Sequence, residues 1–228
     1  MKRFVVSLIL VFFAVMTYAQ RDVTTFLGIP VDGSKAEMKR KLAAKGFVYN
    51  ARDDFFEGEF NGVDVHVFIK TNNNKIYRIA LCDARTRDEA DILIRFNNLV
   101  RQFQNNKRYI TFKDYTLPKT EDISYGITVE NKVYEALFYQ IPIKEALDTL
   151  TLSLGKQLKE EMLEKYTPEQ LENPTEEISN EIKSLSIKMG MDLIYKKPVW
   201  FRISEFYGKY YITMFYDNEY NHADGEDL

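Results

Sequence analysis

Histidine and cysteine, the side chains best suited to nucleophilic and metal chemistry, are scarce in this 228-residue chain and far apart. His66 alternates with valines in a strand-like run, and His222 lies in an acidic stretch near the end. The sole cysteine, Cys82, ends an apolar run with no histidine close in sequence, so we expect a buried, unreactive thiol. Catalytic triads and zinc sites need several such groups together. With no glycine-rich phosphate loop either, the sequence predicts no catalytic residues, no metal site and no cofactor.

Carboxylates are numerous enough to leave two kinds of site open. An Asp/Glu pair held in a cleft would serve glycoside hydrolysis, but sequence alone does not reveal such a pair. The segment from residue 217 also resembles the start of an EF-hand calcium loop, with oxygens on Asp217, Glu219 and Asn221. His222 replaces the required glycine and Leu228 the bidentate glutamate, so a solvated acidic terminus is the preferred interpretation.

Aromatic side chains crowd residues 198–216, on both faces of two expected strands. The preferred interpretation is a sheet covered on both sides by helices. The alternative is one exposed aromatic surface, and because Trp and Tyr combine a large apolar area with a polar group, it would suit a protein, peptide or glycan partner. The candidate ligand-binding residues are Trp200, Tyr207 and Tyr211.

Hydrophobic periodicity and capping residues predict the elements that must position these groups. Alternating runs predict an antiparallel meander over residues 55–82 and later strand pairs. Period-3.6 patterns predict helices, of which the two long ones after Pro142 need an apolar surface to cover. The expected helices are 34–46, 86–105, 143–162 and 174–190, and the expected later strands are 125–129, 132–140, 198–205 and 209–216.

The fold class predicted from these elements is α+β, with antiparallel sheets and helices packed mainly on one side. No Gly-, Ser- or Pro-rich linker divides the chain, so we expect residues 20–113 and 114–228 to form two halves of one compact unit. The first half holds 17 basic and 12 acidic residues (net +5), and the second 12 and 22 (net −10). The acidic total and the lack of a recognised binding module argue against nucleic acid as a partner.

Residues 1–19 have the three parts of a secretory signal peptide. Two cationic residues, Lys2 and Arg3, precede a 13-residue apolar run, residues 4–16. The small residue Ala19 stands at the expected cleavage point before Gln20. A helix of 13 residues spans about 20 Å, too little for the roughly 30 Å core of a bilayer. We therefore expect a soluble, exported protein that begins at Gln20, without a membrane span, in the periplasm or outside the cell.

Two stretches carry a resemblance, TTFLGIPVDGSKAEMKRKLAAKGF with the later FEGEFNG, and YYITMFYDNEYNHADGEDL at the end. They look like uncharacterised exported proteins of the Bacteroidetes. The helix followed by a meander is also similar to the unit of beta-lactamase-inhibitor-like folds and of small outer-membrane-assembly lipoproteins. The resemblance implies a compartment and a binding module. It implies no functional residue, and the lipid-anchor cysteine of the lipoproteins is missing.

The function expected from the sequence is that of an exported, non-catalytic binding or interaction module. Its partner would be another envelope protein, a peptide or a glycan, and the oligomeric state is left open. Two alternatives remain, a hydrolase of the cell envelope that uses an Asp/Glu pair and a purely structural envelope protein.

Overall fold

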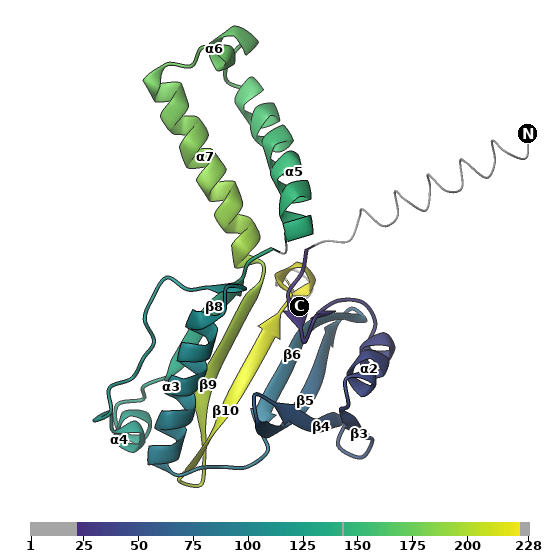
Figure 1. Ribbon diagram of the computed structural model, residues 1–228, viewed down its shortest axis with the longest axis vertical. Helices are drawn as coiled ribbons and strands as arrows, with labels where there is room; N and C mark the ends of the chain where they lie inside the picture. Colours follow the sequence, from purple (N-terminus) through teal and green to yellow (C-terminus); the bar gives the residue numbers. More distant parts are fainter. Residues whose placement is uncertain (1–21, 143, 224–228) are drawn as a thin grey trace, which may run out of the picture.

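A computed structural model describes residues 22–142 and 144–223. The expected signal peptide, residues 1–19, lies outside them. The chain forms an eight-stranded antiparallel sheet in the order β3-β4-β5-β6-β10-β9-β8-β7 and a small sheet of β1 and β2 (Figure 1). The strands are β1 Thr25–Phe26, β2 Ile29–Pro30, β3 Val48–Asn50, β4 Phe55–Phe60, β5 Val63–Asn72, β6 Lys75–Asp83, β7 Tyr109–Ile110, β8 Glu135–Gln140, β9 Pro198–Phe206 and β10 Lys209–Asp217. The helices are α2 Lys35–Ala44, α3 Glu89–Asn105, α4 Ile123–Thr128, α5 Lys144–Leu163, α6 Pro168–Glu172, α7 Glu176–Tyr195 and the 3-10 turn η1 Glu219–Asn221.

One hydrophobic core lies between the sheet and the helices on one of its faces. Met38 and Leu42 of α2 are buried against β5, and α3 buries a stripe that includes Phe96 and Phe103. Both rings of α3 contact Phe201 of β9, with ring centroids 5.3 and 5.6 Å apart. The α+β class with antiparallel sheets is therefore confirmed, as are the meander and the last hairpin.

The two halves of the chain meet at the centre of this sheet, where β6 pairs with β10. A buried carboxylate lies at each end of this β6–β10 seam. Asp83 of β6 accepts from the Arg87 and Arg95 guanidinium groups, at 2.6 and 3.3 Å. Asp217 of β10 accepts two hydrogen bonds from Arg78 of β6. The Arg78–Asp217 ion pair therefore crosses the seam and adds to the backbone ladder, whereas the ion pairs of Asp83 join the end of β6 to α3 and the loop before it.

The long helices do not cover the sheet, and the expectation that they pack on it is wrong. The chain leaves the sheet after β8, forms α5, α6 and α7, and returns into β9, so the helices project from one end of the sheet as a hairpin (Figure 1). Their apolar stripes face each other, with Met162, Ile178 and Met189 buried. The two helices pack on each other rather than on the sheet, and this packing leaves Leu154, Leu158 and Leu185 half-buried.

Three smaller expectations are also corrected. Residues 123–128 form helix α4 rather than a strand, because Asp122 caps its first turn and Ile123 is buried in the core. Helix α3 begins after Asp88, whose carboxylate accepts from the Asp91 N–H, and not after Thr86. Helix α7 continues through Gly190 to Tyr195. Of the helices in the described residues, none is both long and apolar enough to cross a bilayer.

Tyr134, just before β8, links stability to alkaline pH. Its side chain is buried, and its hydroxyl donates to Glu121 Oε1 at 2.6 Å. Burial and this hydrogen bond raise the pKa of Tyr134 from 10.0 to about 12. The folded chain thus keeps a proton that the unfolded chain loses near pH 10, so this stabilisation is complete below pH 10 and disappears as the pH rises to about 12.

We expect the free energy of unfolding, measured by urea denaturation, to fall less steeply from pH 10 to 12 in Tyr134→Phe than in the unsubstituted chain. Tyr216 is fully buried and its pKa is also raised by burial, so part of the slope remains. Equal slopes in the two proteins would contradict this assignment.

Candidate functional site

The face of the sheet opposite α2 and α3 carries the features that a binding surface needs. Cross-strand pairing aligns Phe68, Ala80, Phe215, Trp200 and Leu137 on β5, β6, β10, β9 and β8. We call these five residues the open-face row. Except for the small, buried Ala80, their side chains are half-buried, and none of the helices within residues 22–142 and 144–223 lies over them. The row is therefore a half-buried apolar band across the sheet.

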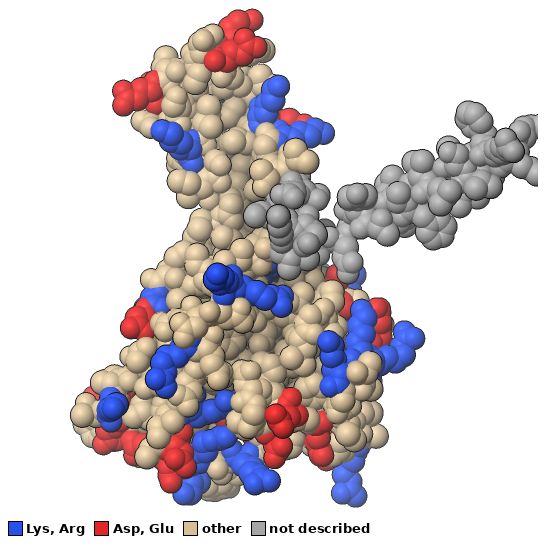
Figure 2. All heavy atoms as spheres, viewed as in Figure 1, with Lys and Arg blue, Asp and Glu red and all other residues tan. Residues whose placement is uncertain are grey.

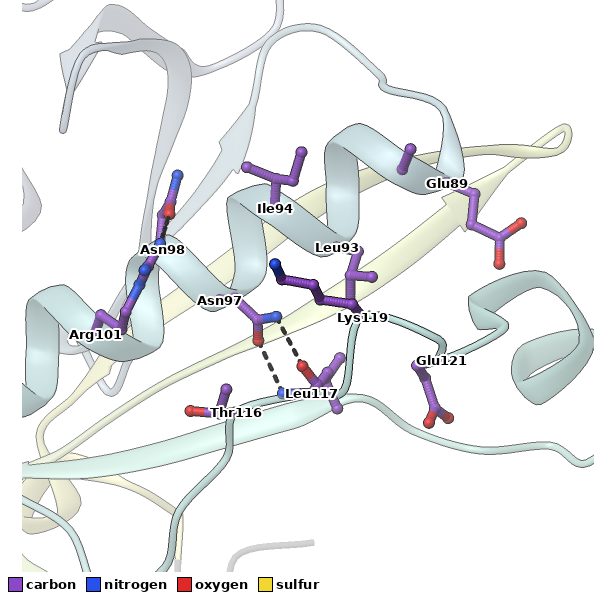
Figure 3. A pocket seen from close by; sticks show the side chains of 11 residues that line it. Glu89, Leu93, Ile94, Asn97, Asn98, Arg101, Thr116, Leu117, Lys119 and Glu121 are labelled. Carbon is purple, nitrogen blue, oxygen red and sulfur yellow. Dashed lines mark hydrogen bonds between the residues drawn. The ribbon is translucent and has the colours of Figure 1, made fainter.

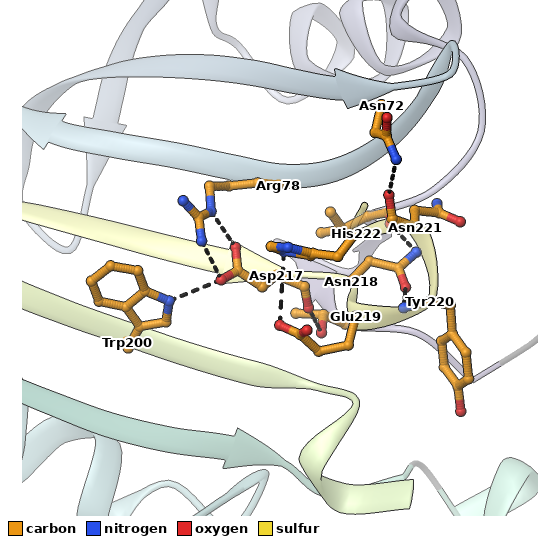
Figure 4. Close-up of polar contacts among 11 residues, drawn as sticks. Asn72, Arg78, Trp200, Asp217, Asn218, Glu219, Tyr220, Asn221 and His222 are labelled. Atoms are coloured by element: carbon orange, nitrogen blue, oxygen red, sulfur yellow. Dashed lines mark hydrogen bonds and ion pairs between the residues drawn. The ribbon is translucent and has the colours of Figure 1, made fainter. Parts of the chain in front are cut away.

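Trp200 is fixed in place at the centre of this row (Figure 4). Its indole is stacked on the Phe215 ring, with centroids 4.0 Å apart and planes at 26°. The indole N–H donates to Asp217 Oδ2 at 2.9 Å. Because both ring orientation and the N–H partner are set within the fold, little side-chain entropy remains to be lost when a partner binds.

Arg78 completes the cluster around Trp200. Its Nε and Nη2 donate to the two oxygens of Asp217 at 2.6 and 2.8 Å, and its guanidinium carbon lies 4.8 Å from the Phe215 ring centroid. Burial lowers the pKa of Arg78, but the hydrogen bonds and charge of Asp217 outweigh it and raise the pKa overall. The guanidinium is therefore a fixed, permanently charged group beside the aromatic rings.

A second row on the same face is polar. The paired positions are Glu57, His66, Cys82, Thr213, Arg202 and Glu135, from β4 to β8. The charged members are exposed, whereas Cys82 is half-buried. An apolar band flanked by charges of both signs is the arrangement of a protein interface with a hydrophobic centre and a polar rim.

The three predicted binding residues do not form one site. Trp200 belongs to the open-face row, and Tyr211 lies on the same face but four residues along β10 from Phe215, beyond the polar row. Tyr207 is 89% exposed at the turn between β9 and β10, where its ring contacts Phe206. Only Trp200 is built into a cluster that would support binding.

Sequence analysis did not select Phe68, Phe215 or Arg78 as site residues, and it assigned Asp217 to the calcium-loop pattern instead. The alternation in β5 places Phe68 on the outer face with His66, so the sequence pattern could have identified Phe68 as a residue of this surface. The contact between Arg78 and Asp217 joins residues 139 positions apart, and nothing local in the sequence indicates it. The cluster therefore depends on the β6–β10 pairing.

The residues of the calcium-loop pattern make hydrogen bonds within the fold. Asp217, Glu219 and His222 have ligand-type atoms within 4.8 Å of one another, but both oxygens of Asp217 already accept from Arg78 and Trp200. Asn218 is buried and bonds to the Val31 carbonyl. The Arg78 guanidinium, which donates to both oxygens of Asp217, disfavours a metal ion at this carboxylate. Residues 224–228 of the pattern lie outside the described residues.

The nucleophile and acid candidates lack activation. His66 lies directly opposite Cys82 on the neighbouring strand, although sequence suggested no partner for this thiol. Burial, followed by the charge of Asp83, raises the pKa of Cys82, which favours the thiol over the reactive thiolate. Carboxylates with a clear shift have lowered pKa values, mainly because of hydrogen bonds, whereas a general acid needs a raised one. These are Glu37, Asp54, Asp114, Glu121, Glu169 and Glu181.

Comparison of the chain with protein-family models, with curated proteins and with solved structures finds no match. The resemblance to exported Bacteroidetes proteins and to inhibitor-like folds therefore stays a prediction. The class that the fold defines is an α+β protein with an antiparallel sheet and a projecting helical hairpin.

Proposed function

We propose that this chain is an exported, non-catalytic binding module that engages a protein or peptide through the open-face row. The observation that carries the proposal is the Trp200 cluster, in which an indole, a stacked phenyl ring and a guanidinium are fixed together on an uncovered sheet face. Trp and Arg are the side chains most enriched at the energetic centres of interfaces, and they act where packing holds them in place.

The spread of the open-face row over several strands favours a macromolecular partner over a small substrate. Half-buried side chains on four strands contribute, and charged side chains of both signs lie beside them. A glycan would also stack on an aromatic ring, but one face of the Trp200 indole is taken by Phe215. A peptide or protein uses both the apolar row and the charged rim, so it is the partner class we propose.

Export to the periplasm or the extracellular space is part of the proposal. It is supported by the cationic start, the 13-residue apolar run and Ala19 before Gln20. A hydrolytic function receives less support, because the carboxylates with clear pKa shifts are shifted downward.

The test is a binding measurement with a matched control. Partners captured from an envelope extract by the immobilised chain would be identified by mass spectrometry, purified and titrated against soluble chain. Trp200 is the sole tryptophan, so its emission reports contact at the open face of the unsubstituted chain, and titration calorimetry gives the affinity of every variant. We expect Trp200→Ala to weaken binding at least about 30-fold, equivalent to about 2 kcal/mol, and Tyr207→Ser to leave it unchanged.

Thermal unfolding of each variant would verify that it is folded, and Trp200→Phe would separate loss of the indole N–H from loss of the ring. A partner that binds Trp200→Ala as tightly as the unsubstituted chain would contradict the proposed surface. Binding of an envelope polysaccharide, with the same loss in Trp200→Ala, would replace the peptide assignment by a glycan.

A further inference from the structure

A groove of about 820 Å³ runs along one flank of α3, between the helix and residues 116–121 (Figure 3). Leu93 and Ile94 of α3 and Leu117 of the loop provide its apolar surface. Ile94 is 58% exposed. The groove is remote from the open-face row because α3 covers the opposite side of the sheet.

The groove is already formed in the unbound chain. Asn97 of α3 holds the far wall with two hydrogen bonds to Leu117, since its Oδ1 accepts from the Leu117 N–H at 2.8 Å and its Nδ2 donates to the Leu117 carbonyl at 2.9 Å. An occupant would not have to order the loop before it binds.

The most exposed charged side chains of the groove are basic, beside two half-buried glutamates, Glu89 and Glu121. Arg101 and Lys119 are exposed on its two walls, and a neighbouring hollow adds Lys107. The acidic residues at the other end are engaged within the fold. Glu89 accepts from the Ser124 N–H at 3.1 Å, and Glu121 accepts from Tyr134 and pairs with Lys132. The fitting occupant therefore carries an apolar side chain flanked by carboxylates.

The chain itself carries such a group at the far end of the helical hairpin. Residues 160–181 contain eight glutamates and one lysine, and acidic side chains are visible there in Figure 2. Leu163 in the last turn of α5 is 41% exposed. The exposed Glu160 lies one turn before it and forms a 3.8 Å ion pair with the exposed Lys156, and the exposed Glu164 follows directly after the helix. We call Glu160, Leu163 and Glu164 the acidic tip.

We propose that the acidic tip of one copy docks into the α3 groove of a second copy, so that molecules associate head to tail. Leu163 would lie against Ile94 and Leu117, with the glutamates near Arg101 and Lys119. Within one molecule the tip lies at the far end of the hairpin, whereas α3 lies against the sheet (Figure 1). A contact between two different surfaces is heterologous, so it closes into a ring or extends as a chain. The proposal does not depend on the open-face row.

Sedimentation velocity of purified residues 20–228, over a concentration series at low and high salt, tests this proposal. We expect concentration-dependent oligomers at low salt that dissociate at high salt, because exposed charges are screened. The groove variant Arg101→Glu/Lys119→Glu and the tip variant Glu160→Lys/Glu164→Lys should each raise the dissociation constant for self-association more than about tenfold. Mixing the two variants should restore assembly, because each supplies a surface that complements the other.

The matched control is Lys45→Glu/Arg52→Glu, which reverses two exposed cations near β3 and should assemble normally. Leu163→Ser should weaken assembly without changing the charge. Circular dichroism would establish that every variant is folded. The proposal is overturned if the chain is monomeric at every concentration in low salt, or if the groove and tip variants assemble as the unsubstituted chain does.

Discussion

Replacing Asp83 by leucine is expected to lower the free energy of unfolding by about 3–5 kcal/mol, because it leaves two arginines without their buried counter-ion. The Asp83 side chain is 2% exposed and lies between Arg87 and Arg95, whose side chains are 21% and 10% exposed. It also accepts from the Ile212 N–H of β10, so one carboxylate joins the loop before α3, α3 itself and both strands of the β6–β10 seam.

Urea denaturation measures this loss, and Asp64→Leu is the matched control. Asp64 also pairs with an arginine, but its side chain and that of Arg85 are 65% and 84% exposed, and the closest N···O distance is 3.6 Å. Exposed pairs contribute about 0–1 kcal/mol, so the control should change little. A loss below about 1 kcal/mol for Asp83→Leu would mean that Asp83 does not hold the seam.

Arg78→Met is expected to lower the free energy of unfolding by a similar amount, about 3–5 kcal/mol, because Asp217 would stay buried without its cation. The side chain of Asp217 is 3% exposed. The Trp200 emission should shift as well, since Asp217 also accepts from the indole and would be free to reorient. Arg202→Met, on the same face but exposed, is the control and should stay within about 0.5 kcal/mol of the unsubstituted chain.

The two substitutions should be additive. Asp83 contacts β10 at Ile212 and Arg78 contacts it at Asp217, about 17 Å apart along a strand of about 3.3 Å per residue. Separate sites at that distance usually combine within about 0.5 kcal/mol. A large interaction energy in the double variant would contradict independent attachment of the two halves.

The fold could be predicted from the sequence where its causes are local. Alternation predicted β5 and β6, and the helix predicted from residue 34 is capped by the Ser34 side chain, which accepts from the Glu37 N–H. The strand predicted at residues 125–129 was wrong. β-branched residues and tyrosine favour a strand, but the Asp122 cap and the burial of Ile123 stabilise a helix there. The fold class needed only the pattern of elements, and that pattern was correct.

The candidate site could be predicted only in part, because it is made by pairing between distant strands. Trp200 was identified by its residue type, but Phe215 and Arg78 join it only once β10 lies between β6 and β9. The partner of the long helices was missed for a related reason. An apolar stripe predicts that one side of a helix is buried, but it does not predict whether a sheet or another helix covers that side.

The N-terminal segment has a consequence for how the chain folds. The Thr24 hydroxyl donates to the Asp217 carbonyl 193 residues later, and Lys197 pairs with Asp22 at 2.6 Å. The β6–β10 seam likewise waits for the last strand, whereas the contacts between α5 and α7 are closer in sequence. High sequence separation slows folding, so the helical hairpin and the hairpins within the sheet should form early, and the β6–β10 seam late. A chain made from its N-terminus onward thus cannot complete its native structure until about residue 218 is present.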